Sequence, residues 1–408
     1  MPRTLFTNAR VFDGTGAPLA DGQVVAEDGL IREVGLGLDG DELIDLGGRG
    51  LLPGLFDTHV HVAFTDIDLW RQVQKPFSLE FYETARNLMT TLRGGITTIR
   101  DAGGADLGTK AALEQGLIGG PRMQISVTMI SQTGGHADDW LASGQTVGLF
   151  NVHPGRPSGI VDGPDEMRRK VRELIRDGAD VIKVATTGGV LSPRDDPRHA
   201  HFAPDELEVL VREAAAAGRW VMAHAQGSEG IKNAVRAGIR SIEHGIYLDD
   251  QAIELMLQRG TYLVPTLVAP RGVLTAAESG MAIPEASLAK AKEVIDIHFD
   301  SFRRAVAAGV RVAMGTDSGV TPHGRNLEEL ALMEQGGMTP AQVLVATTRT
   351  AAELMGLERD SGTIEAGKRA DLVVIDGDPL VMAGLADRVA AVYQKGRLTA
   401  GGVGTGRA

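Results

Sequence analysis

The sequence predicts an α/β protein: a (β/α)8 TIM barrel that carries a small β-sandwich module formed by both chain ends. From Leu51 to about Leu357, short apolar runs alternate with segments of helical periodicity, which is typical of βα units and a parallel sheet. Eight such runs can be counted, and both chain ends show strand-like patterns instead. The length of 408 residues accommodates a barrel of roughly 250–350 residues and a smaller module.

Short strands are expected at both ends of the chain. Near the N-terminus, TLFTNARVFDG and QVVAEDG alternate between polar and apolar residues and break at Gly and Asp. After Gly362 the strand character returns in TIEAGKRADLVVIDGDPL and VAAVYQKGRLTA. We therefore expect residues 1–50 and 360–408 to form one composite β module, and residues 51–359 to form the barrel.

The barrel strands are expected at eight places: Leu51–Asp57, Thr97–Arg100, Met123–Val127, Val181–Ala185, Trp220–Ala223, Ser241–Glu243, Tyr262–Pro265 and Val312–Gly315. Amphipathic stretches lie between them. Two of these stretches, PDEMRRKVRELIRDG and PDELEVLVREAAAAG, begin with a Pro–Asp turn and end in Gly, as capped helices do.

Composition limits the classes of function. The formal net charge is −12, which argues against nucleic acid and anionic membranes as partners, because phosphate contacts need a basic surface. The chain has no cysteine, so disulfides and thiolate metal ligands are excluded. We find neither a leader-like apolar segment at the N-terminus nor an apolar run of about 18 residues, so the cytoplasm is the expected location.

The strongest single motif is His59-Val60-His61, at the end of the first expected barrel strand. Side chains two residues apart in a strand point to the same face, so both imidazoles can bind one ion. An isolated pair of this kind is more often two polar loop residues. Here, however, the buried run LLPGLFD leads directly into the pair, and active sites of barrels lie at such strand ends.

Four further polar residues stand near the ends of other expected strands. Lys183 lies in DVIKV, His224 ends WVMAH, His244 ends SIEH, and Asp317 follows VAMGT. Core residues scattered at random would not all fall on one rim of the barrel. We therefore expect metal chemistry at this rim.

Taken together, these segments resemble the metal-dependent amidohydrolase superfamily, and within it the imidazolonepropionase-related branch of prolidases and Xaa-Arg dipeptidases. The similarity covers essentially the whole chain. It is carried by LPGLFDTHVH, GGITTIRDAGG, SQTGGHAD, IKVATTGGVLSP, VMAHAQG, IEHG, VPTL, GTDSG, ATTRTAAELMGL and GTIEAGKRADLVV. Each fragment alone is weak, but the set is highly specific.

The resemblance implies a centre of two divalent metal ions, with zinc as the expected metal. His59 and His61 would bind the buried ion and Asp317 would complete its site. The second ion would be bound by His224 and His244. Carboxylated Lys183 would bridge the two ions, because a carbamate supplies two hard oxygens and a negative charge where an ammonium would repel zinc. If the site holds one metal, Lys183 is instead a barrel lysine paired with a nearby acid.

The same resemblance implies that the chain hydrolyses an amide or peptide bond. A hydroxide shared by two divalent ions has a lowered pKa and would attack the scissile carbonyl. Asp317 would take its proton and pass that proton to the leaving nitrogen. His136, in GGHAD, would support the carbonyl oxygen; the competing interpretation is a loop histidine bonded to the backbone.

Three loop residues are candidates for substrate binding. Tyr247 follows the sixth expected strand, and Arg194 lies in LSPRDDPRH after the fourth. Arginine suits a substrate carboxylate through its bidentate geometry, although a salt bridge to Asp195 or Asp196 is the competing interpretation. His323 either contacts the substrate or lies exposed to solvent.

The leading interpretation is a dipeptidase or N-acyl amino-acid hydrolase that releases a C-terminal amino acid such as proline. The alternative is a hydrolase of a cyclic amide, urea or carbamate, because the same centre serves all of these. A non-catalytic scaffold is disfavoured because no metal ligand is missing. A deaminase is disfavoured by Lys183 and by Gln226 in AHAQGSEG, where a catalytic Glu is absent. We expect a small-molecule substrate and a homo-oligomer, which is common in this family.

Overall fold

The computed structural model describes residues 2–141, 143–147, 151–192 and 194–402. Parallel strands occupy its centre, in two hydrogen-bonded groups. The first group contains β6 (Leu55–Val60), β7 (Ile96–Asp101) and β8 (Arg122–Ile125). The second contains β9 (Met129–Ile130), β10 (Val181–Ala185), β11 (Trp220–Ala225), β12 (Ser241–His244) and β13 (Tyr262–Val264). The structure is therefore of the α/β class, as expected.

The third expected strand, Met123–Val127, is present as β8, which ends at Ile125, and a second short strand, β9, follows it. β8 pairs with β7, whereas β9 pairs with β10, and Val127 between them has a φ of 69°. A β-branched residue in this left-handed region marks a sharp turn of the backbone. The predicted strand is therefore confirmed except for its last two residues, which belong to the turn between β8 and β9.

The eighth expected strand, Val312–Gly315, is present only as isolated bridges. Val312 bridges to Leu263 in β13, and Ser318 bridges to Val60 in β6. The segment that contains these residues thus contacts both groups of strands. The bridged residues are too few to form a continuous strand pairing with β13 or with β6. A closed ladder around the barrel is not seen in the described residues.

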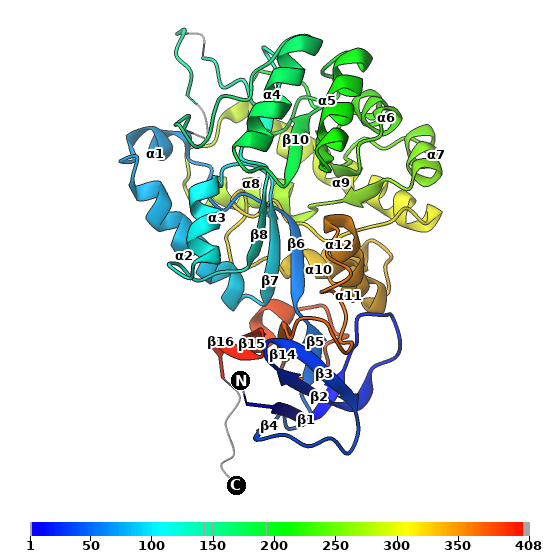
Figure 1. Cartoon of the computed structure of the whole chain (residues 1–408). Coiled ribbons are helices and arrows are strands. Elements are labelled where there is room, and N and C mark those ends of the chain that lie inside the picture. The colour runs from blue at the N-terminus through cyan, green and yellow to red at the C-terminus, as the bar shows by residue number, and fades with distance from the viewer. Residues whose placement is uncertain (1, 142, 148–150, 193, 403–408) are drawn as a thin grey trace.

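Helices surround these strands (Figure 1). The two stretches that begin with Pro–Asp form α4 (Pro164–Arg176) and α5 (Pro204–Ala216), which confirms those predictions. The remaining helices are α1 (Leu69–Gln74), α2 (Leu79–Arg93), α3 (Leu107–Glu114), α6 (Ser228–Ala237), α7 (Asp250–Arg259), α8 (Val268–Glu278), α9 (Glu285–Ala308), α10 (Glu328–Gln335), α11 (Pro340–Thr347), α12 (Arg349–Met355) and the short 3-10 helix η1 (Leu385–Arg388). Among the described helices, none combines the length and the apolar character needed to cross a membrane.

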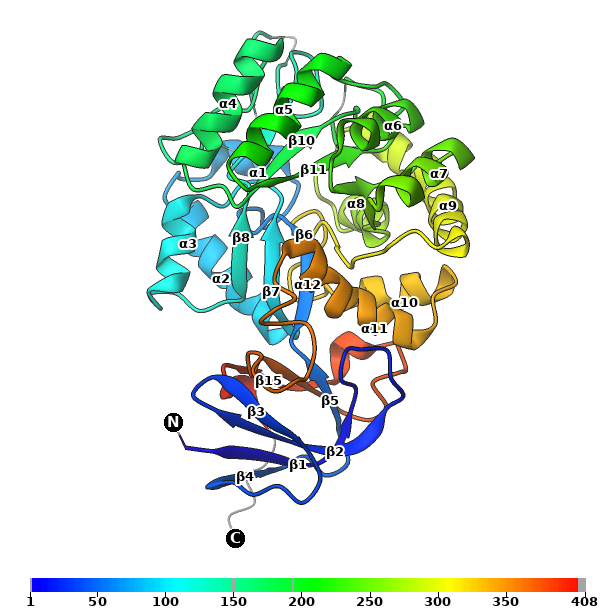
Figure 2. The same cartoon turned by 45° about the vertical axis from the view of Figure 1, so that its right-hand side comes forward.

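Strands from both chain ends form one mixed sheet beside the parallel strands (Figure 2). Its members are β1 (Thr4–Val11), β2 (Ala20–Glu27), β3 (Leu30–Gly35), β4 (Glu42–Asp45), β5 (Gly50–Pro53), β14 (Leu372–Ile375), β15 (Val389–Gln394) and β16 (Arg397–Gly401). The order is β16-β15-β14-β5-β1-β2-β3, with β4 next to β1. Because these strands form a single connected sheet, the predicted β-sandwich is not confirmed.

The expected strand Leu51–Asp57 is in fact two strands in two different sheets. β5 pairs with β14 in the mixed sheet and β6 pairs with β7 in the parallel group, and Gly54 lies between them. The Gly54 amide donates to Asp371 O at 2.7 Å, and a Cβ at this position would lie 2.2 Å from Thr97 Oγ1. Only glycine lets the two sheets approach so closely at this crossing.

Candidate metal centre and active-site cavity

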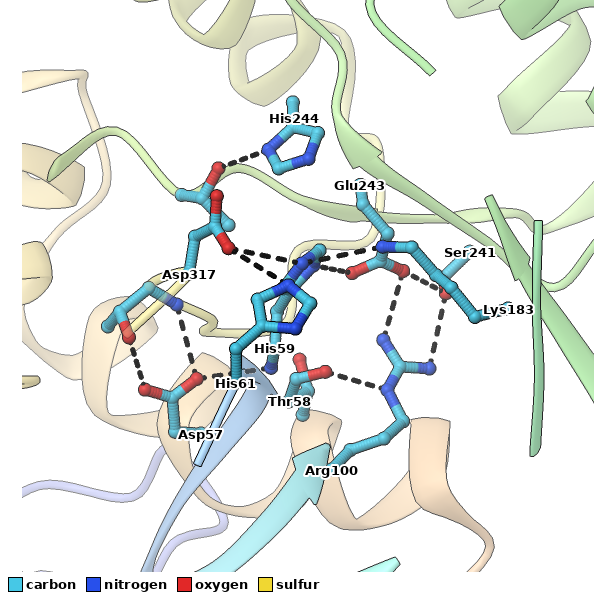
Figure 3. A network of polar contacts seen from close by, with 12 residues as sticks. Asp57, Thr58, His59, His61, Arg100, Lys183, Ser241, Glu243, His244 and Asp317 are labelled. Carbon is cyan, nitrogen blue, oxygen red and sulfur yellow. Dashed lines mark hydrogen bonds and ion pairs between the residues drawn. The ribbon is translucent and has the colours of Figure 1, made fainter. Parts of the chain in front are cut away.

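One cavity of about 190 Å³ opens at the carboxyl ends of the parallel strands. All six residues expected to bind metal line it: His59, His61, Lys183, His224, His244 and Asp317. They come from β6, β10, β11, β12 and the segment after Val312. The period of two at the end of β6 and the parallel packing of the strands bring these residues, far apart in sequence, to one place (Figure 3, where His59, His61, Lys183, His244 and Asp317 are labelled).

The polar atoms of this group lie close together. Asp317 Oδ1 is 3.3 Å from His61 Nε2 and 3.6 Å from His59 Nε2. The Lys183 ammonium nitrogen is 3.4 Å from His59 Nε2. Potential ligand atoms of His59, His244 and Asp317 all lie within 4.8 Å of one another. This donor set of nitrogen and oxygen atoms fits a divalent metal ion such as zinc.

One nitrogen of each imidazole is hydrogen-bonded to a protein group, and this bond determines which ring nitrogen faces the cavity. Nδ1 of His59 donates to Glu243 Oε2 at 2.7 Å, and Nδ1 of His61 donates to Gly103 O at 2.8 Å. His224 is reversed, because its Nε2 donates to Gly188 O at 3.1 Å. A carboxylate or carbonyl accepts only, so the other ring nitrogen presents a lone pair, as a metal ligand must.

His244 completes the set of rings. Its Nδ1 lies 2.7 Å from Thr266 Oγ1, and its ring centroid is 5.1 Å from that of His59 and 4.7 Å from that of His224. Its backbone carbonyl accepts a hydrogen bond of 2.9 Å from His298 Nε2 on α9. The ring is therefore fixed both through its side chain and through its own peptide.

A buried ion pair stands behind His59. The Glu243 carboxylate accepts from Arg100 Nη2 at 3.0 Å and from the Ser241 hydroxyl, while Arg100 Nε donates to Thr58 O at 2.7 Å. Glu243 and Arg100 are both buried. The guanidinium links β7 to β6 and β12, so the carboxylate that orients His59 is itself held from two strands (Figure 3).

Burial and local charge set the protonation of the group. Burial lowers the pKa of His59, His224 and His244 well below the usual value. Burial would raise the pKa of Asp317, but its hydrogen bond with His61 and the nearby positive charges bring it down to about 2. Burial also lowers the pKa of Lys183 to about 8. Neutral imidazoles and an ionised carboxylate are the forms that bind metal.

Two residues of the centre adopt a left-handed backbone. The φ angle is 74° at His244 and 61° at Asp317. Such angles in non-glycine residues cost about 1–3 kcal/mol each and persist only where the surroundings enforce them. Buried Asp57 enforces the turn before Asp317, because its carboxylate accepts from Thr316 N at 3.1 Å, Thr316 Oγ1 at 2.6 Å and Asn326 Nδ2 at 2.8 Å.

Two further predicted residues also line the cavity. The His136 ring stacks on His224, with centroids 4.0 Å apart and planes at 18°. The exposed Arg194 guanidinium lies 5.1 Å from the centre of the Trp140 ring. The acids that might have paired with Arg194 have other partners, because Asp195 contacts Lys290 and Asp196 contacts Arg198.

The other two predicted substrate residues are not among those that line the cavity. The Tyr247 hydroxyl donates to Glu293 Oε1 at 3.4 Å on α9. His323 Nε2 donates to Phe64 O at 2.7 Å, and its Nδ1 lies 3.4 Å from Thr91 Oγ1. His323 is therefore not the solvent-exposed residue that was one expectation, because it is partly buried and contacts both the loop after β6 and helix α2. Its contact with the substrate stays a prediction.

Sequence reasoning missed the residues behind the ligands: Asp57, Arg100, Glu243, Thr266 and His298. Charged residues inside the buried strand sequences LFDTH, TTIRD and SIEH were a usable signal, because a charge is rarely buried without a partner. The single histidine in the amphipathic stretch that forms α9 gave no comparable signal.

The chain matches the family model described as the amidohydrolase family over residues 51–399. Ochratoxinase from Aspergillus niger is 34% identical over 399 residues, which cover 92% of this chain and 82% of that protein. Imidazolonepropionase from Treponema denticola is 25% identical and covers 97% and 98% of the two chains.

Solved structures of related hydrolases are also similar to this chain over almost its whole length. A Xaa-Pro dipeptidase with methionine bound in its active site has a TM-score of 0.88 and 33% identity, covering 97% of this chain and 99% of that one. A prolidase in complex with N-methylphosphonate-L-proline has a TM-score of 0.89 and 34% identity, with the same coverage.

The carboxylate behind His59 gives a first prediction. Glu243→Ala should weaken binding of zinc by about 10- to 100-fold, because His59 loses the acceptor that fixes its tautomer and orientation. Competition with a chelator measures this affinity. The exposed Glu358 serves as the control, since Glu358→Ala should leave the affinity unchanged. An unchanged affinity in Glu243→Ala would show that Glu243 does not orient a ligand.

Proposed function

Because the chain belongs to the amidohydrolase family, we propose that it is a binuclear zinc hydrolase that cleaves the amide bond of a dipeptide or an N-acyl amino acid. It is an enzyme that hydrolyses carbon–nitrogen bonds, as its amide-hydrolysing relatives indicate. The proposed substrate class, a dipeptide or an N-acyl amino acid, rests on one observation: the candidate metal ligands and a cationic side chain, Arg194, line the same cavity.

The proposal includes the architecture that positions this cavity. We infer that the two groups of parallel strands are parts of one (β/α)8 barrel over residues 51–359. The bridges of Val312 and Ser318 to strands of different groups support this inference. Residues 1–50 and 360–408 would be the composite β module, in keeping with the pairing of β5 with β14.

His59, His61 and Asp317 would hold one ion, and His224 and His244 the other. Carboxylated Lys183 would lie between the two. Its burial supports this assignment, since a lysine of lowered pKa is more often present as the neutral amine that reacts with carbon dioxide. Bound ions would supply a water nucleophile of lowered pKa and polarise the scissile carbonyl.

The protein's own groups would move the protons and hold the substrate. Asp317 is ionised and lies beside the ligand nitrogens, so it can take a proton from the attacking water and give it to the leaving nitrogen. His136, at the cavity wall above His224, would support the carbonyl oxygen. Arg194 would bind the substrate carboxylate, and apolar side chains such as Phe64, Ile67 and Val273 would contact its hydrocarbon part.

A substrate screen tests the proposal directly. Zinc-loaded protein would be assayed against Xaa-Pro and other dipeptides, N-acyl amino acids, and neutral ureas, carbamates and cyclic amides, with release of the amine as the measured product. We expect turnover of substrates with a free carboxylate. Exclusive turnover of the neutral compounds would favour the alternative class, and no turnover of any C–N substrate would contradict the proposal.

The second prediction concerns the metal content. Protein produced with zinc and bicarbonate should contain close to two zinc ions per chain, and Lys183→Ala should contain clearly less, because the bridging carbamate is lost. Elemental analysis after dialysis measures both. Lys292, exposed on α9, provides the matched control. One ion per chain, with no change in Lys183→Ala, would contradict the binuclear centre.

The third prediction concerns the proton acceptor. Asp317→Asn keeps the size of the side chain but removes its basicity, so kcat should fall by about 10²–10⁴-fold with a smaller change in KM. Metal content must be measured on the same sample, since Asp317 is also a candidate ligand. Near-normal turnover with intact metal would mean that another group accepts the proton.

The fourth prediction concerns the substrate carboxylate. Arg194→Ala should raise KM for the free acid by roughly 10- to 100-fold, in line with about 1.5–3 kcal/mol for one charge-assisted hydrogen bond. Amidation of the substrate should cost the wild type a similar amount and cost the variant almost nothing more, because both changes remove the same contact. Arg198→Ala, an exposed arginine paired with Asp196, is the control. Additive losses would show that Arg194 does not bind the carboxylate.

A further inference from the structure

The ring of His136, a predicted catalytic residue, is held through a chain of side chains. Its Nδ1 lies 2.7 Å from Ser192 Oγ and 3.6 Å from Asp195 Oδ2. The face of the ring stacks on His224. Both partners of Nδ1 belong to the connection that follows β10, so the position of His136 depends on that connection.

Lys290 on α9 in turn holds this connection. Its ammonium donates to Gly189 O at 2.9 Å, to Ser192 O at 2.7 Å, and to the backbone oxygen of Asp195, and it lies 3.3 Å from Asp195 Oδ1. Three carbonyls and one carboxylate thus converge on a single cation. Ser287, one turn earlier on the same helix, donates to Leu191 O at 2.9 Å.

The direction of each hydrogen bond follows from the donors available. The side chain of Asp195 is only 5% exposed, and its carboxylate accepts from Gly189 N at 3.1 Å and from the Ser192 hydroxyl. Burial would raise the pKa of Asp195, but His136, Ser192 and Lys290 lower it to about 2, so the carboxylate only accepts. The Ser192 hydroxyl has one hydrogen and gives it to Asp195, so Ser192 Oγ accepts from His136 Nδ1–H.

The backbone leaves space for the ring only because residue 189 is glycine. A Cβ there would lie 2.2 Å from His136 Cε1 and 2.4 Å from His136 Nδ1. No side chain can occupy that position while the ring keeps its stacking on His224. Gly189 and Lys290 therefore act on the same ring from two sides.

We propose that Lys290 and Asp195 are positioning residues that act through Ser192 to fix the orientation of His136 and keep a hydrogen on its Nδ1, so that Nε2 is the nitrogen that faces the substrate. The proposal rests on the role of His136 in the proposed function. A ring that keeps its hydrogen on Nδ1 donates from Nε2 to a substrate oxygen only when it is doubly protonated, and the negative charge of Asp195 at the far end of the chain stabilises that charged form.

The test compares Asp195→Asn, Lys290→Met and Gly189→Ala with the control Lys292→Met, whose lysine is exposed on the same helix. The first readout needs no turnover: ¹⁵N spectra of histidine-labelled protein, with the His136 signals assigned by their loss in His136→Gln. In wild type and in the control, Nδ1 of His136 should be protonated. In the three variants that signature should weaken or shift, with zinc content unchanged.

The second readout is the division between kcat and KM. Asp195→Asn leaves the bonds of Lys290 to the backbone, so kcat should fall by up to about 100-fold with KM nearly constant. Lys290→Met also loosens the connection that carries Arg194, so KM should rise as well. Melting temperatures identify any variant that is merely unfolded. Gly189→Ala is the decisive variant, because it keeps Lys290, Asp195 and Ser192 unchanged and displaces only the ring.

Unchanged His136 spectra in Asp195→Asn and Gly189→Ala would overturn the proposal, even if activity fell, because the residues would then have only a structural role. Wild-type kcat in both variants would overturn it too. If no amide substrate is found but the spectra change as described, the positioning of His136 holds and the proposed function fails. The two ideas can therefore fail separately.

Discussion

Several imidazoles can be buried around one cavity only if each ring is neutral and its remaining N–H has an acceptor. The structure meets this requirement for every ring of the centre, and the acceptors come from different parts of the chain: a carboxylate on β12, carbonyls that follow β7 and β10, and a hydroxyl that follows β13. An unpaired N–H at such a site would cost about 1–3 kcal/mol. Each acceptor also fixes which ring nitrogen faces the cavity. The hydrogen bonds that allow the rings to be buried therefore also orient them.

This arrangement ties the stability of the strands to the geometry of the site. Arg100 connects three strands while it holds Glu243, and Asp57 bonds the turn that presents Asp317. The left-handed angles at His244 and Asp317 cost free energy that the packing around them must offset. The cavity thus contains strained backbone that its buried hydrogen bonds hold in place, as expected where side chains are positioned before a ligand arrives.

The sequence predicted the parallel strands, both Pro–Asp helices and the strands at the two chain ends, because periodicity and turn residues are local signals. It also indicated which side chains would share the cavity, since the carboxyl ends of parallel strands meet. It did not predict the division at Gly54 or at Val127, because a turn inside an apolar run changes the hydrogen-bonding partner without changing the pattern. It did not predict that Tyr247 and His323 are not among the residues that line the cavity, because a position in a loop does not fix the direction of a side chain, which here turns to Glu293 and Phe64.

The crossing at Gly54 also affects how the protein is made. β5 reaches its place in the mixed sheet only when β14, which begins at Leu372, pairs with it, while β6 directly after Gly54 carries His59. A ribosome releases β5 and β6 together but must translate almost the whole chain before β14 emerges. Until then one edge of β5 has no neighbour on that side, and an open edge can pair with another chain. The last strands are therefore expected to complete the fold, and a nascent chain that stops before Leu372 would be a substrate for chaperones or proteases.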